Sequence, residues 1–163
     1  MKRTSTIFLQ CVIVLVAVLM LVILLRFPLS EGRNVEATLS EVYFQDPFLA
    51  YIYLASLAVF VGFYQAFVLL KLIRRDNAFT AKAVKAARIL KYCALVFIGF
   101  MLGAEAYLFI VMRGQDDIAG AAMFGLILIL VSLIIAAAAN LLQHVLQSVA
   151  AIEPENKPGT DLN

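Results

Sequence analysis

Residues 118–142 read IAGAAMFGLILILVSLIIAAAANLL, a run of 25 positions without a charged side chain. The hydrocarbon core of a bilayer is about 30 Å thick, and a helix crosses it with roughly 20 apolar residues. Three further apolar runs occupy residues 7–25, 48–70 and 92–112, and the last of them contains one ionisable residue, Glu105. The whole chain is 64% hydrophobic and 15% charged, whereas soluble domains carry about 25% charged residues. We therefore predict an all-α integral membrane protein, a bundle of four transmembrane helices.

A secretory signal peptide is the alternative interpretation of residues 7–25, because Lys2 and Arg3 precede them. The apolar part of a signal peptide is usually only about 7–15 residues long and ends in small residues at a cleavage site. Here the apolar run is longer and continues into Leu-Leu-Arg-Phe-Pro-Leu. We therefore predict that this helix is retained and that residues 1–152 form one transmembrane domain.

The loops carry charge asymmetrically. Between the second and third runs, basic residues outnumber acidic ones seven to one, whereas the first and third connections have net charges of −2 and −1. The seven basic residues are Lys71, Arg74, Arg75, Lys82, Lys85, Arg88 and Lys91. Because Lys and Arg are retained on the cytoplasmic side of a membrane, we predict that this loop and both termini are cytoplasmic. We also predict a disordered cytoplasmic tail over residues 153–163 and a short interfacial helix over residues 37–44.

The basic loop has an internal pattern. Thr80 is a suitable N-cap for a helix that continues into the third span, and from Lys82 onward a basic residue recurs at every third position. This spacing places the basic side chains along one ridge of the helix surface. One hypothesis is that the ridge binds anionic lipid headgroups or docks an acidic cytoplasmic protein. The alternative is that its charge only fixes the topology and anchors the helix ends.

Glu105 is the only ionisable residue well inside a predicted span, roughly 10 Å from the outer end of the third helix. Carboxyl groups at such depth are costly and often mark a transport pathway or a binding site. Ser56, at comparable depth on the second helix, offers a hydroxyl partner if the two faces agree. One hypothesis is therefore a small-molecule or proton-coupled transporter or sensor centred on Glu105. The alternative is a neutral Glu105 that hydrogen-bonds between helices and only holds the bundle together.

Residues of other chemical types predict no site. The only histidine is His144, and Cys11 and Cys93 form neither a disulfide framework nor a metal-ligand pattern, so we predict buried cysteines, no metal and no cofactor. A glycine-rich phosphate loop and a Gly-x-Ser-x-Gly elbow are absent, so we expect neither an enzyme nor direct nucleic-acid binding. Gly99 and Gly103 form a GxxxG motif, for which packing within one chain is favoured over contact between copies in a homo-oligomer.

Several motifs of the second half resemble those of a known family. They are the leucine-rich basic end of the second span at residues 69–75, the step Phe79-Thr80, the entry Lys91-Tyr92-Cys93 to the third span, and the exit helix from Leu142-Gln143 to Glu155-Asn156. Over residues 45–156 the chain resembles the uncharacterised bacterial four-span membrane proteins of domain-of-unknown-function family 2975. One departure is the tail, which continues Lys157-Pro158-Gly159-Thr160 where members often have Asp-Leu-Thr-Val.

This resemblance implies a bacterial inner membrane and no established activity. Members are often encoded beside a small helix-turn-helix regulator, which suggests a membrane partner that holds or releases a transcription factor. The basic loop would be the natural docking surface for such a regulator.

Overall fold

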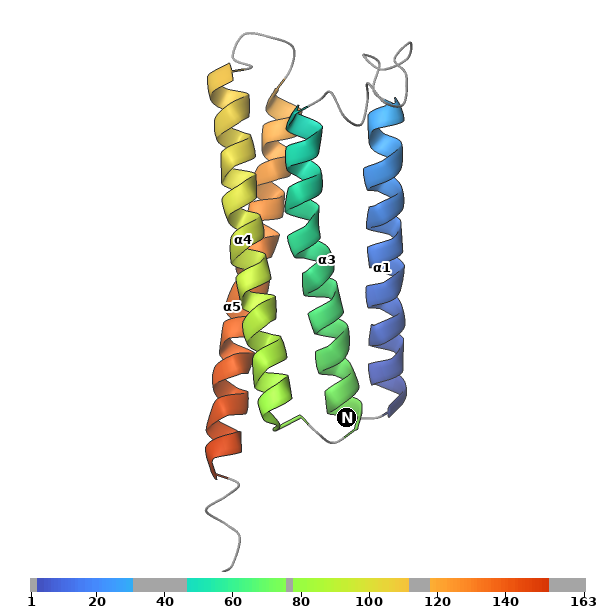
Figure 1. Cartoon of the computed structure of the whole chain (residues 1–163), viewed down its shortest axis with the longest axis vertical. Helices are drawn as coiled ribbons and strands as arrows, with labels where there is room; N and C mark the ends of the chain where they lie inside the picture. Colours follow the sequence, from blue (N-terminus) through green and yellow to red (C-terminus); the bar gives the residue numbers. More distant parts are fainter. Residues whose placement is uncertain (1–2, 31–46, 76–77, 112–117, 153–163) are drawn as a thin grey trace, which may run out of the picture.

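Four α-helices make up the described part of the chain (Figure 1). The computed structural model describes residues 3–30, 47–75, 78–111 and 118–152. The helices are α1 (Arg3–Ser30), α3 (Pro47–Arg74), α4 (Ala81–Val111) and α5 (Ala119–Ile152). Each is long and apolar enough to cross a membrane, which confirms the predicted fold of four transmembrane helices. The predicted interfacial helix over residues 37–44 and the predicted tail over residues 153–163 lie outside the described residues.

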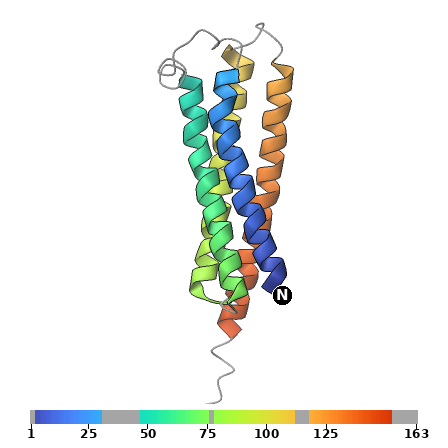
Figure 2. The same cartoon turned by 90° about the vertical axis from the view of Figure 1, so that its right-hand side faces the viewer.

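The helices run alternately up and down, and each packs mainly against its neighbour in the chain (Figures 1 and 2). The contact between α4 and α5 is the most extensive; α3 packs against α4, and α1 packs against α3. Of the four helices, α1 is the most exposed and α4 the most buried. We call the end of the bundle where α3 finishes and α4 begins the basic end. The start of α1 and the end of α5 lie there too, and the opposite end is the far end.

Small residues allow the close contact between α4 and α5, which we call the α4–α5 seam. Buried positions on α5 recur at intervals of three and four residues, except for one interval of seven residues that contains Gly125. The average period of about 3.5 residues is typical of coiled coils. These buried positions are Ala122, Ile129, Ser132, Ala136, Ala139, Gln143 and Leu146. Small side chains let helix backbones approach closely, which is how helices associate within lipid, where apolar burial alone contributes little.

The helices α4 and α5 are longer than the hydrocarbon core is thick. Their 31 and 34 residues extend about 46 and 51 Å, against about 30 Å for the hydrocarbon. Basic side chains recur in the first turns of α4 and are absent from its last turns, so the excess length lies at the basic end. Counting about 20 residues from the far end places the edge of the hydrocarbon near Lys91 and Asn140. Residues 81–90 and 141–152 therefore project beyond the hydrocarbon, and we call them the overhang.

The overhang has an apolar core of its own. Leu69 of α3, Leu146 of α5 and three alanines of α4 pack together, each 5% exposed or less. Because the α4 and α5 members of this cluster lie in the overhang, their burial from water stabilises it by about 25 cal/mol per Å² of apolar surface. The helix α4 begins directly after Thr80, whose carbonyl oxygen accepts the backbone N–H of Val84 at 3.2 Å, as its position before the helix predicts.

Candidate functional site

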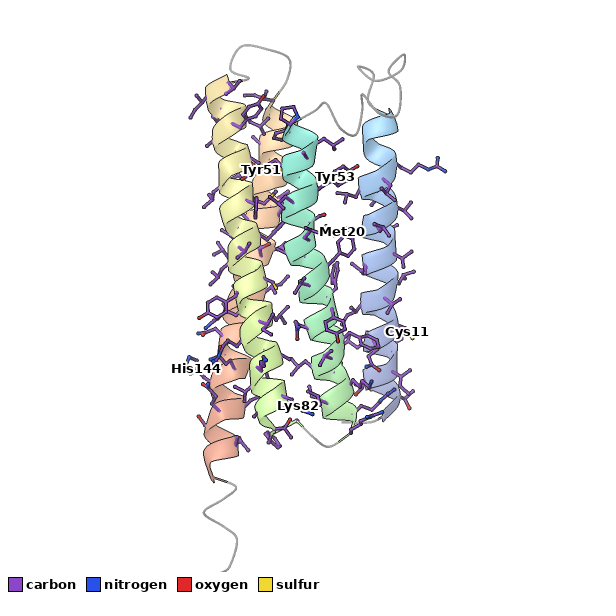
Figure 3. The ribbon with its side chains drawn as sticks, in the orientation of Figure 1. Cys11, Met20, Tyr51, Tyr53, Lys82 and His144 are labelled. Atoms are coloured by element: carbon purple, nitrogen blue, oxygen red, sulfur yellow. The ribbon has the colours of Figure 1, made fainter. Side chains whose placement is uncertain are left out.

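Six basic side chains gather at the basic end of the bundle. This basic surface consists of Lys71, Arg74 and Arg75 from the end of α3 and Lys82, Lys85 and Arg88 from the start of α4. Five of the six are exposed, and Lys82 marks the place in Figure 3. In the described part of the chain the only acidic residue is Glu105, which lies far along α4, so none of the six has a carboxylate partner there. Within the described residues, their charge is therefore not neutralised by a carboxylate.

The alanine face of α4 fixes how the basic side chains are presented. Ala83, Ala86 and Ala87 are at most 2% exposed and pack in the apolar core of the overhang. The exposed Lys82 directly precedes Ala83, and the exposed Lys85 lies between Ala83 and Ala86. Since the alanines have no rotamers to change, the helix backbone beneath the basic surface is held firmly against α3 and α5.

Lys91 departs from this surface. Three residues advance a helix by about 300°, so the ridge drifts by about 60° at each step and has turned to another side by Lys91. Its side chain is half-buried; Nζ donates to Oδ1 of Asn140 on α5 at 3.4 Å and lies 5.0 Å from the centroid of the Tyr92 ring. This lysine is therefore held at the edge of the α4–α5 seam, at the level of the hydrocarbon boundary.

Glu105 lies inside the α4–α5 seam, toward the far end. Its side chain is 7% exposed. A Cβ atom placed on Gly125 of α5 would fall within the Glu105 carboxyl group, so the missing side chain of Gly125 provides the room that the carboxyl occupies. Oε2 of Glu105 is buried and has no hydrogen-bond partner in the residues described. The site is a buried carboxyl that faces a glycine and lacks a donor at one oxygen.

Ser56 does not serve as the partner of Glu105, because the two faces do not agree. Ser56 is 4% exposed, and its Oγ donates to the carbonyl oxygen of Tyr53 in its own helix at 2.7 Å, an arrangement common for serine within helices. The condition for a contact between Ser56 and Glu105, that the two faces agree, is therefore not met by this hydrogen bond. The interhelical hydrogen bond that would make Glu105 a simple packing residue is also missing at Oε2 within the described part.

The GxxxG motif does not bring two helix backbones together along its whole length. Gly103 receives the side chain of Tyr51 from α3, whose hydroxyl donates to the carbonyl oxygen of Phe100 at 2.7 Å. A Cβ atom on Gly99 would meet nothing within 4 Å. The motif thus contributes to packing within the chain at Gly103 only.

Two side chains attach α1 to α3. Tyr53 reaches from α3 toward α1 (Figure 3) and donates to the carbonyl oxygen of Leu24 at 3.2 Å. Gln10 on α1 donates through Nε2 to the carbonyl oxygen of Phe67 at 3.5 Å. Gln10 and Thr6, one turn apart, are 6% and 1% exposed. This buried polar pair was missed in the sequence, although its spacing within an otherwise apolar run is a usable signal.

The cysteines and the remaining buried polar side chains form no further candidate site in the described residues. Cys11 is exposed and Cys93 half-buried, and both thiols are free, so the expectation of buried cysteines is wrong for Cys11 and met only in part by Cys93. Gln143, 7% exposed in the seam, has a buried Oε1 without a partner in the described residues. Among those residues no group of three or more His, Cys, Asp or Glu is placed to hold a metal ion.

Comparison with known proteins agrees with the motifs of the second half. A family described as "Protein of unknown function (DUF2975)" matches residues 33–158. The "Uncharacterized membrane protein YoaS" of Bacillus subtilis (strain 168) is 34% identical over 158 residues, which cover 96% of this chain and 98% of the relative. No solved structure matches the chain. These matches confirm the resemblance that the motifs predict, and they extend it from residue 45 toward the N-terminus. This membrane protein therefore belongs to the DUF2975 family.

Proposed function

We propose that this chain is a non-enzymatic, multi-pass protein of the bacterial inner (plasma) membrane, and that its basic surface binds a cytoplasmic helix-turn-helix regulator. The bacterial relative supports the bacterial membrane, and the family resemblance suggests the class of regulator. The observation that carries the proposal is the exposure of the basic surface on a firmly packed helical overhang. The chain itself has no direct contact with nucleic acid.

The orientation follows from the same charges. Basic residues cluster where α3 ends and α4 begins, and such clusters stay on the cytoplasmic side during insertion. The start of α1 and the end of α5 lie at this end of the bundle. Both termini are accordingly cytoplasmic.

The height of the basic surface favours a protein over a lipid as its main ligand. Lys82 precedes Lys91 by nine residues on the same helix, which places it about 13 Å beyond the hydrocarbon edge. The headgroup layer on one side of a bilayer is only about 5–8 Å thick. Arg88, about 4–5 Å beyond the edge, lies among anionic headgroups, whereas Lys82 stands in the aqueous phase and suits an acidic patch on a soluble protein.

A crosslinked pull-down from native membranes tests this proposal. The full chain is compared with the triple variant Lys82→Glu, Lys85→Glu and Arg88→Glu, and stoichiometric soluble partners are identified by mass spectrometry. We expect the wild type to recover a helix-turn-helix protein and the triple variant to lose it, because like charges would then face each other.

The matched control keeps the charge: Lys82→Arg, Lys85→Arg and Arg88→Lys should retain the partner. A C-terminal topology reporter must show the same orientation in all variants, because basic residues also direct insertion. Undiminished recovery with the triple variant contradicts the docking role. If the wild type recovers only lipid, the basic surface binds lipid instead of a protein. If it recovers only copies of itself, the basic surface is a contact within a homo-oligomer.

A second candidate function rests on a separate observation: Oε2 of Glu105, buried in the seam, has no hydrogen-bond partner among the described residues. We propose as the alternative a small-molecule or proton-coupled transporter or sensor centred on Glu105, since intramembrane carboxyls commonly mark such sites. Four helices enclose little space in one protomer, so transport would require a homo-oligomer.

Glu105→Gln tests the alternative, because it removes the charge while nearly preserving the shape of the side chain. We expect it to change a pH- or ligand-dependent response without reducing expression. Ser132→Ala, at another buried polar position of the same seam, is the matched control and should leave the response intact. An unchanged response in Glu105→Gln would reduce Glu105 to a packing residue.

A further inference from the structure

We propose that the contact between Glu105 and Gly125 is a proton-binding site, in which the ligand of the carboxyl is a proton and not a metal ion or an organic cation. This inference rests on the second candidate function and makes its ligand specific. It is carried by three features of the seam: the burial of Glu105, the lack of a partner for Oε2 among the described residues, and the glycine against which the carboxyl lies.

The donor set does not suit a metal ion. Hard cations such as Ca²⁺ and Mg²⁺ take about six or more oxygen ligands. The buried residues of the seam around Glu105 are apolar: Met101 and Leu108 on α4, and Ala122 and Ile129 on α5. In the described part of the chain the carboxyl of Glu105 is the only one, and intact helices keep their backbone carbonyls engaged. A metal ion would keep too few ligands.

The room around the carboxyl does not suit an organic cation. The space left by the missing side chain of Gly125 is filled by the Glu105 carboxyl itself. The side chain is only 7% exposed, so a bulky ammonium or guanidinium group has no approach that leaves the seam closed. A proton occupies no such volume.

The neighbouring helices bring no counter-ion. Residues 47–70 of α3, 92–111 of α4 and 119–143 of α5 contain no Lys, Arg, His or Asp, and Glu105 is their only Glu. Among the described residues of α3 and α4 in the far half, the other titratable groups are phenols: Tyr51 donates to Phe100, Tyr53 donates to Leu24, and Tyr107 stacks on Phe48 with ring centroids 5.4 Å apart. Arg26 lies on α1, which packs against α3. An ionised carboxyl in this place would be uncompensated, which is costly in an apolar medium.

Protonation and closure of the seam are therefore coupled. The neutral acid fits against Gly125 with α4 and α5 in contact, whereas release of the proton leaves a charge that needs water or a donor. Neither is supplied while the two helices stay packed. The protonated form is the form of the closed seam, and the ionised form requires the two helices to separate near Gly125.

Infrared spectroscopy of the full chain in lipid vesicles tests the proposal. At neutral pH we expect a carbonyl-stretch band of a neutral carboxylic acid that shifts in deuterated buffer and is lost entirely in Glu105→Gln. The matched control Gln10→Ala, which alters a buried polar residue far from the seam site, should keep the band. Gly125→Leu, which expels the carboxyl from its place, should shift the band or abolish it.

A wild-type spectrum without this band, or a band that survives Glu105→Gln, overturns the proton site. If Glu105→Gln does not fold, the response of the band to Gly125→Leu decides, and an unaltered band there also contradicts the proposal. The test is separate from that of the candidate function. If Glu105→Gln loses the infrared band but leaves the cellular response unchanged, the proton site stands and the sensor or transporter is refuted. If Glu105→Gln changes the response but the wild type shows no such band, the sensor or transporter stands and the proton site is refuted.

Discussion

Replacing Gly125 by alanine puts a methyl group where the Glu105 carboxyl lies. Because Gly125 lies on α5, the methyl group would push the carboxyl away from that helix, and within the described part of the seam Oε2 has no hydrogen bond to lose. Overpacking of this kind costs about 1–3 kcal/mol, while alanine in place of a helical glycine contributes about 1 kcal/mol in the opposite direction. We therefore expect Gly125→Ala to lower the free energy of unfolding by up to about 2 kcal/mol.

A double-mutant cycle separates the clash from the helix propensity. Glu105→Ala removes the carboxyl, so in that background Gly125→Ala should stabilise the protein by about 0.5–1 kcal/mol. The coupling energy between the two positions should therefore be about 1–3 kcal/mol. Unfolding in mixed micelles with an increasing fraction of SDS, followed by circular dichroism, measures each of the four variants.

Two other glycines serve as controls, because a Cβ atom on Gly99 or Gly120 meets nothing within 4 Å. Gly99→Ala and Gly120→Ala should be neutral or stabilising by up to about 1 kcal/mol. If the changes in the free energy of unfolding caused by Glu105→Ala and by Gly125→Ala add within about 0.5 kcal/mol in the double variant, the contact between Glu105 and Gly125 is refuted. A Gly125→Ala variant as stable as Gly99→Ala would also refute this contact.

The same unfolding assay checks two further contacts. Tyr51→Phe removes the 2.7 Å hydrogen bond to the Phe100 carbonyl oxygen and should cost about 0.5–1.5 kcal/mol, whereas Tyr64→Phe, at a side chain that is 64% exposed, should change little; equal effects would contradict the bond. Leu146→Ala, at a position 4% exposed in the overhang, should cost about 2–4 kcal/mol. Leu141→Ala, 67% exposed, should stay within about 0.5 kcal/mol of the wild type, and a similar loss in both variants would argue against an apolar core in the overhang.

The number and order of the helices could be predicted from the sequence because bilayer thickness imposes a minimum length on each apolar run. The start of α4 after Thr80 also follows from local chemistry, since a capping residue ends the preceding turn. The length of α4 and α5 beyond the hydrocarbon was less evident. It depends on alanines that lie between the basic residues and pack against Leu146, a contact between segments distant in the sequence.

The neighbour of Glu105 could not be predicted from the pattern around it. A transmembrane helix is apolar on nearly every side, so periodicity does not tell which face meets which helix. Depth alone suggested Ser56 on α3, but Glu105 turns to Gly125 on α5. A clue was present in α5, where small residues repeat at coiled-coil intervals and identify the face that a neighbouring helix approaches.

The uninterrupted course of α4 makes it a mechanical lever between the two ends of the bundle. The helix contains no proline and continues without a break from Ala81 to Val111. Glu105 and Lys85 are 20 residues apart on this rod, or about 30 Å. A swing of about 5° with its pivot at Glu105 would carry Lys85 sideways by roughly 2.5 Å, comparable to the length of a hydrogen bond. A small change in the angle at which α4 packs near Glu105 would therefore move the basic side chains at the opposite end of the helix by a distance that a bound partner would detect.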